Sequence, residues 1–178
     1  MSLKLTNLKK LTLGVILWLS LLGTIVAITT LPITTNKAVD IDFLPAKDDT
    51  KALIFFGFNG CSDVCPTTLA ILRDLLLLEE DQSQWPQLLF IDIDQTSSSQ
   101  NANDYAQQFH PHIKGYQPSQ GEFASLVRQF GLTIEQKDKR IDHLGRLYLL
   151  HKKSQSWFLV KTYNASTYSA KTLKNELF

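Results

Sequence analysis

The sequence lacks the features that would place it in several broad classes of protein. Only three of its 18 basic residues, Lys4, Lys9 and Lys10, precede residue 37, so the remainder carries 15 basic against 17 acidic residues. This mildly acidic remainder argues against a nucleic-acid-binding protein, which would present a basic face. No internal repeat is visible, and 178 residues with 44% hydrophobic content suffice for one globular domain with a substantial core.

The N-terminal region lacks charge altogether between Leu11 and Leu31. As a helix with a rise of about 1.5 Å per residue, this apolar segment reaches the ~30 Å of a bilayer core. We therefore expect one transmembrane anchor over residues 11–31. No A-x-A cleavage site follows, which argues against the alternative of a cleaved signal peptide, and no arginine precedes Arg73, which argues against a mitochondrial presequence.

The lysines that precede the apolar segment set its expected orientation. The positive-inside bias places residues 1–10 in the cytoplasm and the bulk of the chain across the membrane. We expect a bacterial inner-membrane protein whose domain faces the periplasm, a compartment that oxidises thiols. Residues 32–50 are polar with two prolines and predict a tether, and residues 51–178 predict the domain itself.

The domain opens with two apolar runs, residues 51–58 and 87–94, that are typical of buried strands. The leucine-rich segment after Pro66 predicts a helix between them, so the two strands form a parallel pair with a right-handed crossover. Further along the chain we expect helices over 97–109, 118–131 and 169–177, and a hairpin of strands 145–150 and 157–163. This order predicts an α/β, thioredoxin-like domain with a central mixed sheet and flanking helices.

Both cysteines of the chain, Cys61 and Cys65, follow the first strand, in "FFGFNGCSDVCPTTL" (55–69). Pro66 disfavours helical geometry at Cys65, which is therefore expected just before the helix, as its cap residue. A helix N-terminus favours a thiolate, so we expect a lowered pKa at Cys65 in particular. Thiolates are both nucleophiles and metal ligands, so a structural disulfide, a redox pair and a metal site all stay open.

A metal site would need a further ligand from a loop at the same end of the sheet. His143 precedes the third strand, in a loop that packs over the cysteine site in thioredoxin-like folds and usually carries a cis-proline. Here the loop has Ile-Asp-His instead. Two thiolates and one imidazole suit Cu(I). His110, His112 and His151 are expected in solvated loops and turns.

Three blocks occur in order along the chain: "FGFNGCSDVCPTTL", "FHPHIKG" and "DHLGRLYLL". Together they resemble the SCO/SenC family of copper-binding assembly factors for cytochrome c oxidase, over roughly residues 51 to 175. The resemblance implies a thioredoxin-like domain on one membrane anchor, with copper held by Cys61, Cys65 and His143. Cu(I) is the expected ion and Cu(II) the alternative.

The resemblance also implies a function and its partners. The expected role is a metallochaperone, rather than an enzyme, that delivers copper to the CuA centre of cytochrome c oxidase subunit II or to another periplasmic acceptor. The alternative is a membrane-tethered thiol–disulfide oxidoreductase in which Cys61 attacks a client disulfide, Cys65 resolves it, and a thiol reductant resets the pair. Ser62 and Leu144 stand where the family has proline and serine.

Overall fold

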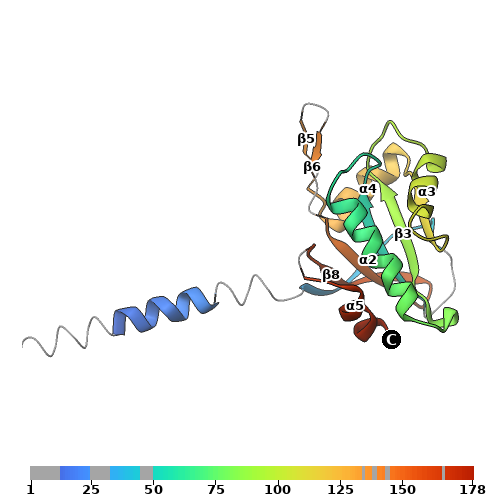
Figure 1. Cartoon of the computed structure of the whole chain (residues 1–178). Helices are drawn as coiled ribbons and strands as arrows, with labels where there is room; N and C mark the ends of the chain where they lie inside the picture. Colours follow the sequence, from blue (N-terminus) through green and yellow to red (C-terminus); the bar gives the residue numbers. More distant parts are fainter. Residues whose placement is uncertain are drawn as a thin grey trace, which may run out of the picture. The chain divides into compact units, whose positions relative to one another are not determined.

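The computed structural model describes residues 13–24, 33–44, 50–133, 135–137, 140–142, 145–165 and 167–178. The chain divides into two compact units, Met1–Pro32 and Ile33–Phe178. The second unit contains both cysteines and the sheet (Figure 1).

The first unit contains a helix over residues 13–24, which lies within the segment predicted to form an anchor over 11–31. Its large apolar side chains, among them Leu13, Trp18 and Leu21, are exposed. At about 1.5 Å per residue the helix is roughly 18 Å long. None of the helices in the described residues is both long enough and apolar enough to cross a membrane.

The second unit is built on a six-stranded mixed sheet (Figure 1). From one edge to the other, its strands are β1 (Ile33–Val39), β8 (Ser156–Tyr163), β7 (Leu147–Lys153), β2 (Lys51–Gly57), β3 (Gln87–Asp92) and β4 (Ile113–Tyr116). Strands β2, β3 and β4 are parallel, whereas β7 pairs antiparallel with both β2 and β8, and β1 pairs antiparallel with β8. Strands β5 (Glu135–Lys137) and β6 (Arg140–Asp142) form a separate two-stranded sheet.

Helices cover both faces of the large sheet. Helices α2 (Val64–Leu78), α3 (Ser99–Gln107) and α5 (Ala170–Leu177) pack on one face and α4 (Gln120–Phe130) on the other, and a short 3₁₀ helix, η1 (Gln82–Gln84), precedes β3. Side chains alternate along β2, so Leu53 and Phe55 face α2 whereas Ile54 and Phe56 face α4. The predicted central mixed sheet with flanking helices is confirmed.

Most predicted elements match the structure to within a few residues. The parallel β2–β3 pair and the β7–β8 hairpin are both present, and α4 ends at Phe130 with Gly131 as its C-cap, at a left-handed φ of 60°. Helix α2 differs, because it begins at Val64 and includes Cys65 in its first turn. A proline is tolerated in the first turn, where its missing N–H would have no partner within the helix, so Pro66 does not exclude Cys65 from the helix.

Residues 33–39, which were predicted to belong to the tether over 32–50, instead form strand β1. This strand lies at the edge of the sheet, where it pairs with β8. Lys37 and Ala38 are exposed while Val39 is buried. An edge strand that is largely solvated needs no continuous apolar run, so the pattern that reveals a buried strand is absent from "ITTNKAV".

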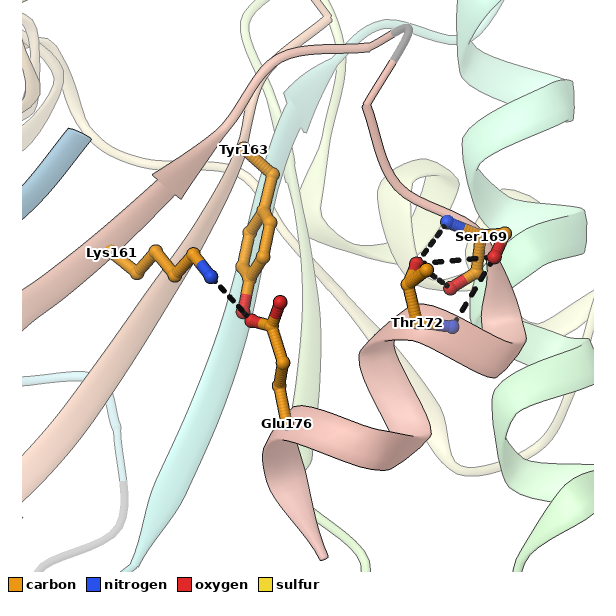
Figure 2. Close-up of polar contacts among 5 residues, drawn as sticks. All are labelled: Lys161, Tyr163, Ser169, Thr172 and Glu176. Atoms are coloured by element: carbon orange, nitrogen blue, oxygen red, sulfur yellow. Dashed lines mark hydrogen bonds and ion pairs between the residues drawn. The ribbon is translucent and has the colours of Figure 1, made fainter. Parts of the chain in front are cut away.

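Helix α5 is attached to β8 by a polar cluster (Figure 2). The Tyr163 hydroxyl donates a hydrogen bond to Glu176 Oε2 at 2.7 Å, and Lys161 Nζ donates to the same oxygen at 2.6 Å. Ser169 and Thr172 form a capping box at the start of the helix. Burial by itself would raise the pKa of Glu176, but the hydrogen bonds from Lys161 and Tyr163 outweigh it and lower that pKa.

We expect Glu176→Gln to remove a pH-dependent part of the stability. Because the folded-state pKa of Glu176 lies below its ordinary value of 4.5, the carboxylate stabilises the fold above that value and stops doing so as the pH falls through the folded-state pKa. Urea denaturation should therefore find the variant less stable than the parent at neutral pH, with the difference shrinking in acid. Exposed Glu80 supplies the control, Glu80→Gln. A constant difference across the pH range would contradict this assignment.

Candidate metal centre

Cys61 and Cys65 lie where β2 passes into α2. Cys61 belongs to the connecting loop, and its N–H donates to the Phe58 carbonyl at 3.3 Å. Cys65 is the second residue of α2, and its N–H donates to the Sγ atom of Cys61 at 3.4 Å. The Cys61 sulfur therefore lies at the helix N-terminus, where backbone N–H groups have no partner within the helix.

The two cysteines differ in their exposure to solvent. Cys65 is fully buried in the core on the α2 face of the sheet, whereas Cys61 is only half-buried. A Cβ atom at Gly57 would lie 2.7 Å from Cys65 Sγ. A glycine at the end of β2 thus leaves the space that the buried sulfur occupies. The site combines one sulfur that solvent can reach with one that the core holds in place.

The two thiols also differ in pKa. For Cys61, burial would raise the pKa, but hydrogen bonds from the Cys65 thiol and from the backbone N–H groups of Asp63, Val64 and Cys65 lower it overall. For Cys65, burial is the largest cause of a strongly raised pKa, followed by its hydrogen bond to Cys61. The prediction of a lowered pKa at Cys65 is therefore wrong. The Cys61 sulfur accepts hydrogen bonds from the N–H groups at the helix terminus, whereas the Cys65 thiol lies in the core.

A buried carboxyl group, Asp92, lies at the same end of the sheet. Asp92 pairs with Gly57 in the β2–β3 register and is 0% exposed. Its Oδ1 accepts the N–H of Asp94 at 3.0 Å, while Oδ2 has no hydrogen-bond partner within the described part of the chain. Burial raises the pKa of Asp92, and the hydrogen bond from Asp94 offsets part of that rise. The charge of Asp92 in turn helps to raise the pKa of Cys65.

Asp92 is not among the predicted site residues, although the alternation of side chains along β3 contains the necessary signal. Leu88 and Phe90 of β3 face α2, so every second residue, and hence Asp92, points to the face on which Cys65 is buried. A carboxyl group in a buried parallel strand cannot serve as an apolar core side chain. Its presence at the end of β3 therefore indicates that this residue lies near the functional site.

The third predicted site residue, His143, lies outside the described residues, as does Leu144. Strand β6 ends just before it at Asp142, and the next described residue is Gly145. Gly145 is buried with a φ of 58°, and a Cβ atom there would collide with the side chain of Val64. The residue that leads into β7 therefore lies against the first residue of α2, next to Cys65.

The remaining histidines lie at the other end of the sheet. His110 and His112 precede β4, and their rings pack edge-on against Trp85 with centroid distances of 5.6 and 5.0 Å. His151 pairs with Lys51 at the start of β2. Among the residues that the structure describes, no three His, Cys, Asp or Glu side chains lie close enough together to hold a metal ion.

Comparison with known proteins identifies relatives of this chain. The model of the SCO1/SenC family matches residues 47–177. "Protein SCO2 homolog, mitochondrial" of Bos taurus is 33% identical over 107 residues, which make up 55% of this chain and 40% of that protein. The match thus spans less than half the length of this curated relative.

Solved structures show the same fold. The solution structure of apo Sco1 from Thermus thermophilus superposes with a TM-score of 0.64 at 25% identity, covering 83% of this chain and 91% of that chain. The crystal structure of Arabidopsis thaliana ScoI with copper bound has a TM-score of 0.61 at 24% identity, covering 73% and 83%. The match of the family model extends from before β2 to the end of α5 and includes both cysteines. This chain belongs to the SCO1/SenC family.

Proposed function

We propose that this protein is a membrane-anchored copper chaperone that takes part in assembling the CuA centre of a cytochrome c oxidase. The observation that carries the proposal is the pair of cysteines at the start of α2, one half-buried and one fully buried, with the N–H of Cys65 donating to the Cys61 sulfur. Family membership supports it, because the related ScoI of Arabidopsis thaliana has been solved with copper bound. Copper is here the cargo, passed on to an acceptor.

The donor set fits copper in its lower oxidation state. Thiolates are soft ligands that favour Cu(I), and an imidazole completes a site of low coordination number. We propose Cys61, Cys65 and His143 as the three ligands, with Cu(II) as a second state of the same site. Gly145 supports the choice of His143, because it contacts Val64 and two residues of chain span at most about 7 Å.

The ligand set is tested by titrating the reduced full chain with Cu(I) against a competing chelator. We expect one copper per chain, with affinity falling more than about 100-fold in Cys61→Ser and Cys65→Ser and at least about tenfold in His143→Ala, since even residues that only orient ligands contribute 10- to 100-fold. His151→Ala, at the opposite end of the sheet, is the matched control and should bind as the parent does. If His143→Ala also binds as the parent does, the imidazole is not a ligand.

A second function, thiol–disulfide exchange, is favoured by the unequal pKa values of the two cysteines. The lowered pKa and partial exposure of Cys61 suit an attacking thiolate, and the buried Cys65 suits a resolving thiol. Attack of Cys61 on a client disulfide forms a mixed disulfide and releases one client thiol. Cys65 then attacks Cys61 Sγ, which releases the second client thiol. The client gains two electrons and two protons, the pair becomes a disulfide, and a thiol reductant is needed to reset it.

The order of reactivity in the pair can be measured directly. With a limiting amount of iodoacetamide near neutral pH, we expect Cys61 to be alkylated at least about tenfold faster than Cys65, because the thiolate is the reactive form and only Cys61 reaches solvent. Peptide mass spectrometry after a second, differently labelled reagent in denaturant gives both rates. Faster alkylation of Cys65 would exclude Cys61 as the attacking thiol.

We further propose that residues 11–31 anchor the protein in a bacterial inner membrane, with residues 1–10 in the cytoplasm and the domain in the periplasm. The uncharged sequence and the exposed apolar side chains of the helix over 13–24 support the anchor, and the three lysines before it support the orientation.

Membrane attachment is tested in a bacterial host that expresses the full chain. We expect the protein to stay with the membrane fraction through alkaline carbonate extraction and to be digested when protease is added to spheroplasts. A form with residues 11–31 deleted is the control and should leave the membrane fraction. Full release of the intact chain by carbonate would contradict the anchor. Protection of the chain in spheroplasts, with digestion only after lysis, would contradict the orientation.

A further inference from the structure

A buried hydrogen-bonded cluster joins three distant parts of the chain beside the cysteine site. Tyr168, between β8 and α5, is 7% exposed, and its hydroxyl lies 2.9 Å from Thr68 Oγ1 on α2. The same hydroxyl donates to the carbonyl of Gly145 at 3.3 Å. A tyrosine hydroxyl has only one hydrogen, so Thr68 must be the donor to Tyr168. The bonds therefore run in one direction, from Thr68 through Tyr168 to Gly145.

The two ends of this cluster are close to the proposed ligands. Thr68 follows Cys65 by three residues in α2, so the two are neighbours on the helix surface. Gly145 follows His143 by two residues, which span at most about 7 Å. Tyr168 thus links the helix of one proposed ligand to the segment that carries another.

The position of Gly145 is restricted from two sides. Its carbonyl accepts the hydrogen bond from Tyr168, and its Cα lies so close to Val64 that no Cβ would fit. Its φ of 58° is in the left-handed region that favours glycine. A ligand whose segment is already held in place loses less conformational freedom when it binds, so binding is tighter.

We propose that Tyr168 is a positioning residue for copper binding, which acts by holding Gly145, two residues after His143, beside the first turn of α2 through its hydrogen bonds with Thr68 and Gly145. The proposal rests on the proposed function, because it takes His143 as a copper ligand. Tyr168 does not itself contact the metal, and its effect passes through the backbone of Gly145.

The experiment is a double-mutant cycle on Cu(I) affinity, measured on the reduced full chain by competition with a chelator. We expect Tyr168→Phe to lower the affinity about tenfold in the parent, as is typical of residues that orient metal ligands. In the His143→Ala background the same change should cause no further loss. A purely structural effect of Tyr168→Phe would persist when His143 is absent.

Tyr163→Phe is the matched control. It also removes a hydroxyl from a buried tyrosine, and the rings of Tyr163 and Tyr168 pack with centroids 6.2 Å apart. However, the Tyr163 hydroxyl donates to Glu176, on the side of α5 that faces β8 (Figure 2). We expect Tyr163→Phe to lower the thermal unfolding midpoint about as much as Tyr168→Phe and to leave Cu(I) affinity unchanged.

The outcomes separate this inference from the function on which it rests. If His143→Ala weakens copper binding but Tyr168→Phe does not, or if Tyr163→Phe weakens it equally, the positioning role is overturned while the ligand set stands. If His143→Ala leaves the affinity unchanged, the ligand set and the positioning role are both overturned. A loss of Cu(I) affinity on Tyr168→Phe in the parent, with no further loss in the His143→Ala background, supports the proposal.

Discussion

The contact between the Cys65 sulfur and Gly57 determines how the first turn of α2 lies on the sheet. Strand β2 is buried on both faces, and its parallel pairing with β3 places Gly57 beside Asp92 at the end of the pair. Because Gly57 has no side chain, the sulfur of Cys65 occupies the space above it. The N–H groups at the start of the helix are then left for the Cys61 sulfur.

This arrangement gives two cysteines, four residues apart in the sequence, opposite electrostatic surroundings. Burial penalises the thiolate at both, but at Cys61 the hydrogen bonds from the helix terminus and from the Cys65 thiol outweigh that penalty. At Cys65, burial, the hydrogen bond that its thiol donates to Cys61 and the nearby charge of Asp92 outweigh the hydrogen bond from the Phe58 backbone, so the thiol form is favoured. Such a pair suits stepwise chemistry, in which the first sulfur reacts before the second. Capture of a soft metal ion and disulfide exchange both begin with that step.

The C-terminal segment reaches the neighbourhood of the cysteines through Tyr168, whose hydroxyl contacts Thr68 although the two residues are 100 positions apart in the sequence. Two tyrosines with packed rings have different functions there. Tyr163 attaches α5 to β8 through Glu176, which holds the helix on the sheet. Tyr168 points the other way, toward α2 and Gly145. The two tyrosine hydroxyl groups of this segment therefore bond to different parts of the fold, one to α5 and the other to α2 and Gly145.

The amino-acid sequence by itself determined the class of fold, the parallel β2–β3 pair, the β7–β8 hairpin and the cysteine pair, because buried strands, capped helices and turns have local patterns that can be read one segment at a time. It did not reveal β1, whose residues carry no apolar run, since an edge strand is stabilised by its pairing with β8. Only the tertiary structure decided which cysteine has the lowered pKa, and it brought Asp92, Tyr168 and Gly145 to the site. Burial and hydrogen bonding between distant segments depend on which elements pack together, and no local pattern of residues encodes that.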